Sequence, residues 1–189
     1  MLIRFNHKAY SVFIISLLLS GCFGGAATKP ALMICDELDD TDDWIEPAVN
    51  IQQKYGTPLA LTLAMLELPL TELDKKHVRP RAADWDEFRI RSERWDAEPT
   101  EVEDAVHFIG WFTQQSVSRN GLAWNNAAGH YLALRLGHGG YHRFDSTKYP
   151  ELTQQARGIQ QRYDRWQREL HGCKDRWQGE SWFSKLKIW

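Results

Sequence analysis

The feature that most constrains the fold is a run of ten residues, Leu59–Leu68, that is nearly all apolar. Proline flanks this run on both sides, at Pro58 and Pro69. Thr57 followed by Pro58 is typical of a helix start, with threonine as the N-cap and proline at the first helical position. Pro69 would end the helix because proline lacks an amide hydrogen and clashes with the preceding turn. A helix that is apolar on all sides must be buried, so the sequence predicts a central buried helix at Leu59–Leu68.

The chain beyond this run also has the pattern of helices separated by glycine and proline. Apolar residues recur at intervals of three and four, and no segment alternates as a strand would. We therefore predict an all-α domain without internal repeats. Its further elements are a helix capped by Asp42 or Asp43 and stopped by Gly56, Asp84–Arg94, a long helix opened by Pro99 and closed by Gly121, Trp124–Leu136, a tight loop at Gly137–Gly140, and Glu151–His171, opened by Pro150 and stopped by Gly172.

The N-terminus has the pattern of an export signal. Basic residues precede an apolar run, Ala9–Leu19, that is too short to span a bilayer. The adjoining Leu19-Ser20-Gly21-Cys22 resembles the lipobox of bacterial lipoproteins, in which the cysteine becomes the acylated first residue. The resemblance implies a signal peptide at 1–21, a lipid anchor on Cys22 followed by a tether to residue 34, and attachment to the periplasmic face of the outer membrane. The alternative is a plain signal peptide or membrane helix with a chance cysteine.

Cysteine parity predicts a disulfide. If Cys22 carries lipid, Cys35 and Cys173 remain, and an even number of cysteines in an oxidising compartment favours pairing. A bridge would join the two ends of the domain, which we place at 35–173. It would close a loop of more than 100 residues and so stabilise the domain by roughly 4–5 kcal/mol. The alternative is two free thiols.

Composition excludes several classes of function. The chain has 23 Lys and Arg against 25 Asp and Glu, a net charge of −2, which provides no basic field for nucleic acid. His130, His142 and His171 lack the spacing with cysteines or carboxylates that is typical of a metal site. No glycine motif for phosphate precedes a helix. We therefore expect no nucleic-acid partner, no metal and no cofactor.

Two stretches resemble a known family. The first is Asp104–Phe112, with the sequence DAVHFIGWF, and the second is Leu132–Tyr141, ending in GHGGY. Together with Lys54-Tyr55-Gly56-Thr57-Pro58, they resemble the soluble lytic transglycosylases, over roughly Cys35 to Cys173. The resemblance implies a goose-type lysozyme-like fold and peptidoglycan glycan strands as the partner. That family cleaves the MurNAc–GlcNAc bond with one glutamate as acid and then base, forms 1,6-anhydro ends and needs no metal.

The positions that carry the family's chemistry are altered here. By the resemblance, Pro69 occupies the position of the catalytic glutamate, and Leu70 replaces the serine that follows it. The Gly-Tyr-Ala-Gln-like segment that supports the glutamate is missing between Arg81 and Asp84. In the third motif, Leu134–Leu136 replace one aromatic and two polar residues. We therefore predict that the scaffold persists without catalysis.

A relocated acid would restore an enzyme. Glu72 lies three residues after Pro69, and its leucine neighbours would provide the apolar setting in which a carboxyl serves as a general acid. Glu67 lies about 200° from the family position around a helix and would point away. The other interpretation of Glu72 is a solvated loop charge.

The candidate glycan-binding residues are His138, Gly139 and Tyr141. His138 could bond a sugar or a backbone carbonyl, Gly139 permits a close approach, and Tyr141 could stack on a sugar or pack on the core. Most tryptophans occupy inward helical positions, where core packing is expected. These are Trp44, Trp85 and Trp111, with Trp95 as a further candidate.

The last segment, 174–189, is both basic and apolar. It could lie on a membrane surface or dock on a partner, or pack on the domain itself. Three functions therefore stay open. They are a peptidoglycan-binding module without catalysis, a transglycosylase that uses Glu72, and a protein-interaction scaffold of the cell envelope.

Overall fold

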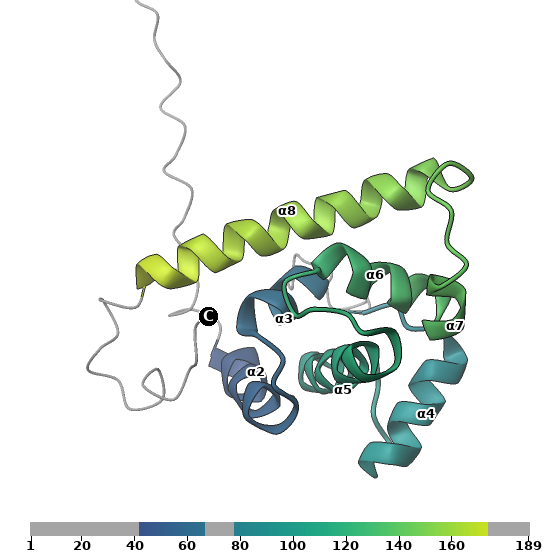
Figure 1. The fold of residues 1–189 in the computed structure, drawn as a ribbon. Coiled ribbons are helices and arrows are strands. Elements are labelled where there is room, and N and C mark those ends of the chain that lie inside the picture. Colours follow the sequence, from purple (N-terminus) through teal and green to yellow (C-terminus); the bar gives the residue numbers. More distant parts are fainter. Residues whose placement is uncertain (1–41, 67–77, 174–189) are drawn as a thin grey trace, which may run out of the picture. The chain divides into compact units, whose positions relative to one another are not determined.

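The computed structural model describes residues 42–66 and 78–173, and these residues form helices without any strand among them (Figure 1). The predicted all-α class is confirmed. The predicted signal peptide, tether and C-terminal tail lie outside the described residues. No helix in the described part is long and apolar enough to cross a membrane. The helices are α2 (Asp42–Tyr55), α3 (Leu59–Met65), α4 (Ala82–Ser92), α5 (Val102–Asn120), α6 (Ala127–Leu136), α7 (His138–Tyr141) and α8 (Pro150–Cys173).

Helix α5 is the centre of the domain and contacts α2, α3, α4, α6 and α7 (Figure 1). Phe108 lies at the middle of an aromatic cluster, with ring centroids 5.1 Å from Trp85, 5.4 Å from Phe88 and 6.0 Å from Trp111. The inward positions predicted for Trp85 and Trp111 are confirmed. Trp95, by contrast, is 58% exposed. Helix α4 ends before it, so the helical periodicity does not reach Trp95.

Helices α2 and α5 approach each other closely at Gly110. A Cβ atom there would lie 2.8 Å from the Cβ of Ile51 and 2.8 Å from the Cδ2 of Tyr55. Beside this contact, the Thr57 hydroxyl donates to the Gly110 carbonyl at 3.2 Å and lies 2.9 Å from the Thr113 hydroxyl. Thr57 is therefore not the predicted N-cap, because its side chain bonds α5, and Pro58 takes the N-cap position of α3.

Helix α3 is buried at every position, which confirms the predicted central helix. It ends at Met65, three residues earlier than expected. Leu66 has an extended backbone (ψ 135°), and the Arg162 guanidinium of α8 donates to its carbonyl at 3.1 Å. This bond from α8 satisfies a carbonyl that a helix end leaves without a partner.

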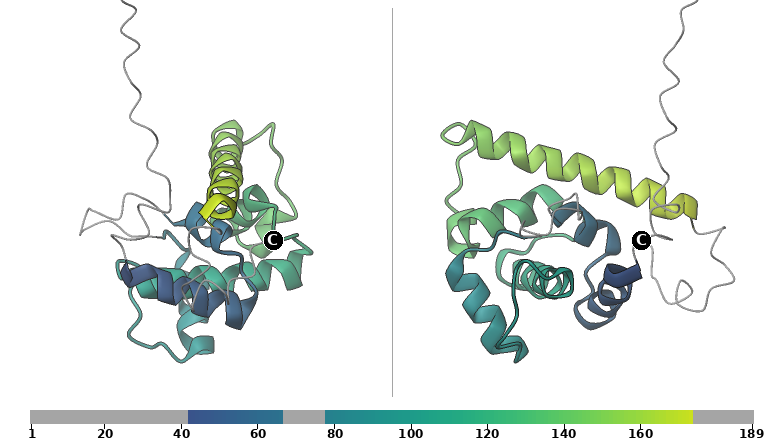
Figure 2. Two further views of the ribbon diagram at one scale, coloured as in Figure 1. Left: turned by 90° about the vertical axis from the view of Figure 1, so that its left-hand side faces the viewer. Right: turned by 180° about the vertical axis from the view of Figure 1, so that it is seen from behind.

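Helix α8 packs on α3 and α6, on the side of the domain away from α4 (Figure 2). Gln160 fixes it to the start of α6, because its side chain accepts from the Ala128 amide at 3.1 Å and donates to the Asn125 carbonyl at 3.1 Å. The helix continues through Gly172 to Cys173, so the predicted stop at Gly172 is wrong. Gly172 is not among the described glycines with positive φ, which is the geometry a glycine stop requires.

Several other boundaries differ from the sequence pattern. Helix α5 begins at Val102, three residues after Pro99, and α4 ends at Ser92, two residues before Arg94. Helix α4 begins at Ala82, two residues early, and α6 begins at Ala127, three residues late, because the Asn126 side chain caps it by accepting from the Gly129 amide at 2.9 Å. The expected loop at Gly137–Gly140 is largely one helical turn, α7. Gly137 alone makes the change of direction (φ +75°), and the Tyr141 amide then bonds the Gly137 carbonyl at 2.9 Å.

Candidate functional site

The predicted site residues divide into two groups. Pro69 and Glu72 lie outside the described residues, as do Cys22 and Cys35. Cys173 is the last residue of α8, so the predicted disulfide and the predicted acid remain predictions. The predicted glycan-binding residues His138, Gly139 and Tyr141 are all in α7, which packs against α5 and α6.

His138, the first residue of α7, is held against α5. Its ring stacks on Phe112, with centroids 4.7 Å apart and planes 16° from parallel. Its Nδ1 lies 2.7 Å from the Oδ1 of Asn120. The amide nitrogen of Asn120 donates to the His138 carbonyl at 3.0 Å and to the Nε2 of His142 at 3.0 Å. Since that nitrogen supplies both donors, Oδ1 accepts from His138, which assigns the imidazole proton to Nδ1.

This tautomer leaves the other ring nitrogen of His138 as an acceptor. Nε2 is buried and has no hydrogen-bond partner among the described residues. Burial, together with the nearby Arg119, lowers the pKa of His138 to about 4. The imidazole is therefore neutral near pH 7, and its Nε2 is an acceptor enclosed by the surrounding side chains.

Charged side chains of α4 and α5 lie close to α7. Arg119 donates to Glu87 at 2.7 Å, and this bond lowers the pKa of Glu87. Burial raises the pKa of Asp84, although Arg81 lies 3.7 Å away and opposes the shift. Asp84 is thus the carboxyl in this region whose environment favours the protonated form, and sequence reasoning did not single it out.

Arg81 closes the end of α6. Its guanidinium donates to the Leu136 carbonyl at 3.0 Å, and a Cβ on Gly137 would lie 1.4 Å from the same nitrogen. The backbone of Gly137 also has a positive φ (+75°), which favours glycine at this position. Of the other altered residues of the third motif, Leu134 is buried in the core and Arg135 is exposed. The third motif therefore places one leucine in the core, an arginine at the surface and, at Leu136, a carbonyl occupied by Arg81.

The remaining predicted residues of α7 have different surroundings. Gly139 is exposed, which leaves its backbone open to close approach. Tyr141 is half-buried and packs partly against the core, with its ring 5.9 Å from that of His142. The packing alternative for Tyr141 therefore holds for part of its ring, and the rest remains accessible.

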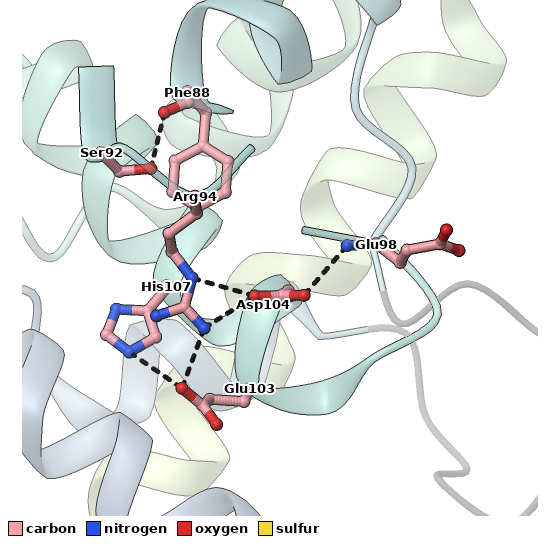
Figure 3. A network of polar contacts seen from close by, with 7 residues as sticks. All are labelled: Phe88, Ser92, Arg94, Glu98, Glu103, Asp104 and His107. Atoms are coloured by element: carbon pink, nitrogen blue, oxygen red, sulfur yellow. Dashed lines mark hydrogen bonds and ion pairs between the residues drawn. The ribbon is translucent and has the colours of Figure 1, made fainter. Parts of the chain in front are cut away.

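A second polar cluster at the other end of α5 is structural (Figure 3). Arg94 donates to Asp104 at 2.9 Å and to Glu103 at 2.9 Å, and the second oxygen of Asp104 accepts from the Glu98 amide at 2.9 Å. His107 lies 3.8 Å from Glu103, and burial lowers its pKa. These bonds tie the segment after α4 to the first turn of α5, where carboxylates also suit the helix dipole.

Sequence reasoning missed Asn120 and Arg81, which position the α7 residues. Asn120 bonds a residue 18 positions away, and Arg81 bonds a residue 55 positions away. No local sequence pattern could therefore have identified them. Within the described residues there is no group of three or more His, Cys, Asp or Glu that could hold a metal ion.

Comparison with known proteins identifies the family. A family model described as "Transglycosylase SLT domain" matches residues 74–173, from before α4 to the end of α8. No curated protein and no solved structure matches the chain. The match covers more than half of the chain and includes α5, α6 and α7. The chain therefore belongs to the transglycosylase SLT domain family, which connects it with peptidoglycan and with a transglycosylase-like function.

Proposed function

We propose that this domain binds the glycan strands of peptidoglycan without cleaving them. The observation that carries the proposal is Pro69 at the family's acid position, since proline has no group that can transfer a proton. The third motif supports it, because Leu134 is in the core and Arg81 occupies the Leu136 carbonyl. Helices α5, α6 and α7, which surround the third motif, are all formed.

The proposed binding residues are His138, Gly139 and Tyr141. The neutral imidazole of His138, fixed by Asn120 and Phe112, would hold α7 in position, and its Nε2 is an acceptor that a sugar hydroxyl would reach once the covering side chains move aside. Exposed Gly139 permits a sugar to approach the backbone. The accessible part of the Tyr141 ring would cover a sugar face.

The proposal also includes the location of the domain in the cell envelope. Acylation of Cys22 would hold it at the periplasmic face of the outer membrane, where it would meet the sacculus, and a Cys35–Cys173 bridge would close the domain. Cys22→Ser should accumulate as unprocessed precursor. Normal maturation of this variant would contradict the lipid anchor.

The test is incubation of the full chain with purified sacculi, followed by two measurements. Co-sedimentation should show binding, and chromatography of the soluble fraction should show no anhydro-muropeptides above a heat-inactivated control. Product release that disappears in Glu72→Gln, or in Asp84→Asn, would establish an enzyme with a relocated acid. Neither release nor binding would favour the protein-interaction scaffold.

A matched pair of variants tests the binding residues. His138→Gln should weaken sacculus binding, because glutamine lacks the Nδ1 donor to Asn120 and the ring that stacks on Phe112. His107→Gln is the control, since His107 is also a partly buried histidine but lies within α5, in the cluster of Figure 3. Equal binding by both variants would remove His138 from the site.

A further inference from the structure

The outer face of α8 carries a row of arginines that form few contacts with the rest of the domain. One of them, Arg165, lies over the ring of the buried Trp166, with its guanidinium carbon 4.6 Å from the ring centroid. The buried residues of α8 form one stripe, namely Ala156, Ile159, Tyr163, Trp166 and Leu170. On the opposite side, Arg157, Gln161, Arg165 and Arg168 are exposed. At 100° per residue they fall within about 80° around the helix, and they extend over about 17 Å along it. We call these four residues the α8 basic strip.

The strip keeps most of its positive charge free. Within the described residues, Arg157 and Arg168 form no ion pair, and Arg165 has only a loose one, with its Nε 3.8 Å from Glu169. Asp164, at the edge of the strip, accepts a hydrogen bond from Gln160 at 3.0 Å, on the side toward α6. The whole chain has a net charge of −2, so the strip is a local concentration of positive charge.

The strip borders a hollow next to the end of α3. The hollow has a volume of about 420 Å³, and its described lining consists of Gly158, Gln161, Arg162 and Arg165. A Cβ on Gly158 would meet nothing within 4 Å, so the helix surface is open there. Arg162, beside the strip, bonds the Leu66 carbonyl just before the altered catalytic segment. The strip thus lies beside Leu66, which comes three residues before Pro69 in the chain.

We propose that the α8 basic strip binds the carboxylates of the stem peptides that peptidoglycan glycan strands carry. This inference rests on the proposed function and names the chemistry of a second contact with the same polymer. Charge complementarity supports it, because stem peptides bear several free carboxylates and guanidinium groups pair with carboxylates through parallel hydrogen bonds. A polymer with many carboxylates would also engage several arginines at once, which compensates for weak single contacts.

The test compares intact sacculi with sacculi whose carboxylates have been converted to amides, which remain sedimentable. The variant is Arg157→Gln/Arg165→Gln/Arg168→Gln in the full chain. The control, Lys54→Gln/Arg91→Gln/Lys148→Gln, removes the same charge from exposed side chains outside α8. Thermal unfolding verifies that both variants fold. Exposed ion pairs are individually weak, so we expect the strip variant to bind intact sacculi about tenfold more weakly, and the control to bind as the unmodified protein does.

The outcomes separate the two proposals. Amidation should weaken the unmodified protein about as much as the strip substitutions do, and should not weaken the strip variant further. Equal binding of the unmodified protein to intact and amidated sacculi would overturn the inference and leave the proposed function standing. No binding to either form would overturn both. Strip-dependent binding to phosphatidylglycerol vesicles, with sacculus binding unchanged in the variant, would replace the peptidoglycan contact by a membrane contact.

Discussion

Helices α5 and α8 are the two longest in the described part of the domain, with 19 and 24 residues, and they use their surfaces differently. Helix α5 is enclosed by five neighbours, whereas α8 packs on α3 and α6 (Figure 1). In α5 nearly every residue from Ala105 to Thr113 is buried. In α8 only one stripe is buried, and the opposite side carries arginines. The comparison shows that the packing of the domain depends on most of the surface of α5 but on only one stripe of α8, which leaves the outer face of α8 free for other contacts.

The largest effect should follow from opening the aromatic cluster of α5. Phe108→Ala would leave a cavity among Trp85, Phe88 and Trp111, and a buried Phe→Ala substitution costs about 3–5 kcal/mol. Urea denaturation should show this loss. Tyr149→Ala, just before α8, is the control, because Tyr149 is 52% exposed and its loss should change stability by less than about 0.5 kcal/mol. Similar losses in the two variants would refute the comparison.

Replacing a glycine by alanine should have an intermediate effect on stability, and the sign of this effect should differ between α5 and α8. Gly110→Ala in α5 would press a methyl group against the Cβ of Ile51, which can yield only if α2 moves, so we expect a loss of about 1–3 kcal/mol. Gly158→Ala in α8 meets open space and should gain about 0.5–1 kcal/mol, because alanine favours the helix. Thermal unfolding measures both, and a loss in Gly158→Ala would show that α8 is more crowded than its surface indicates.

The last expected effect is a loss of stability in acid. His130 is in α6 and His138 is in α7. Burial is the chief reason that both have pKa values lowered to about 4, against about 6.5 in the unfolded chain. Both are neutral in either state above pH 7. As the pH falls below 6.5, the unfolded chain takes up protons that the folded chain does not, so stability falls between about pH 6.5 and pH 4. Between pH 7 and pH 6 the loss should be on the order of 1 kcal/mol.

Urea midpoints at pH 7 and pH 6 test this dependence. Asn120→Asp is the diagnostic variant, because a carboxylate at this position still accepts from the Nδ1 of His138 and would raise the pKa of that imidazole. Its midpoint should therefore fall less with acid than that of the unmodified protein. Identical midpoints of the unmodified protein at the two pH values would contradict the assignment of buried neutral histidines.

Local patterns in the chain are enough to predict the helices, the buried run before Leu66, and the inward tryptophans of α4 and α5. Each of these depends on residues three or four positions apart, and that spacing can be read directly. The family resemblance also came from short motifs, and the match over 74–173 confirms it. Some predicted helix boundaries are wrong because a residue distant in the chain forms a hydrogen bond there. Thr57 bonds α5 instead of capping α3, and Arg162 bonds the Leu66 carbonyl from 96 residues away.

The chemistry around α7 and α8 depended on the tertiary structure alone. Asn120 determines the tautomer of His138, and burial together with the nearby Arg119 lowers its pKa. No spacing in the chain predicts the contacts of this ring with Asn120 and Phe112. The basic strip likewise becomes visible only once the buried stripe of α8 is known. Helical periodicity tells which residues share a face, but a neighbouring helix decides which face is covered, because burial depends on contacts between segments far apart in the chain.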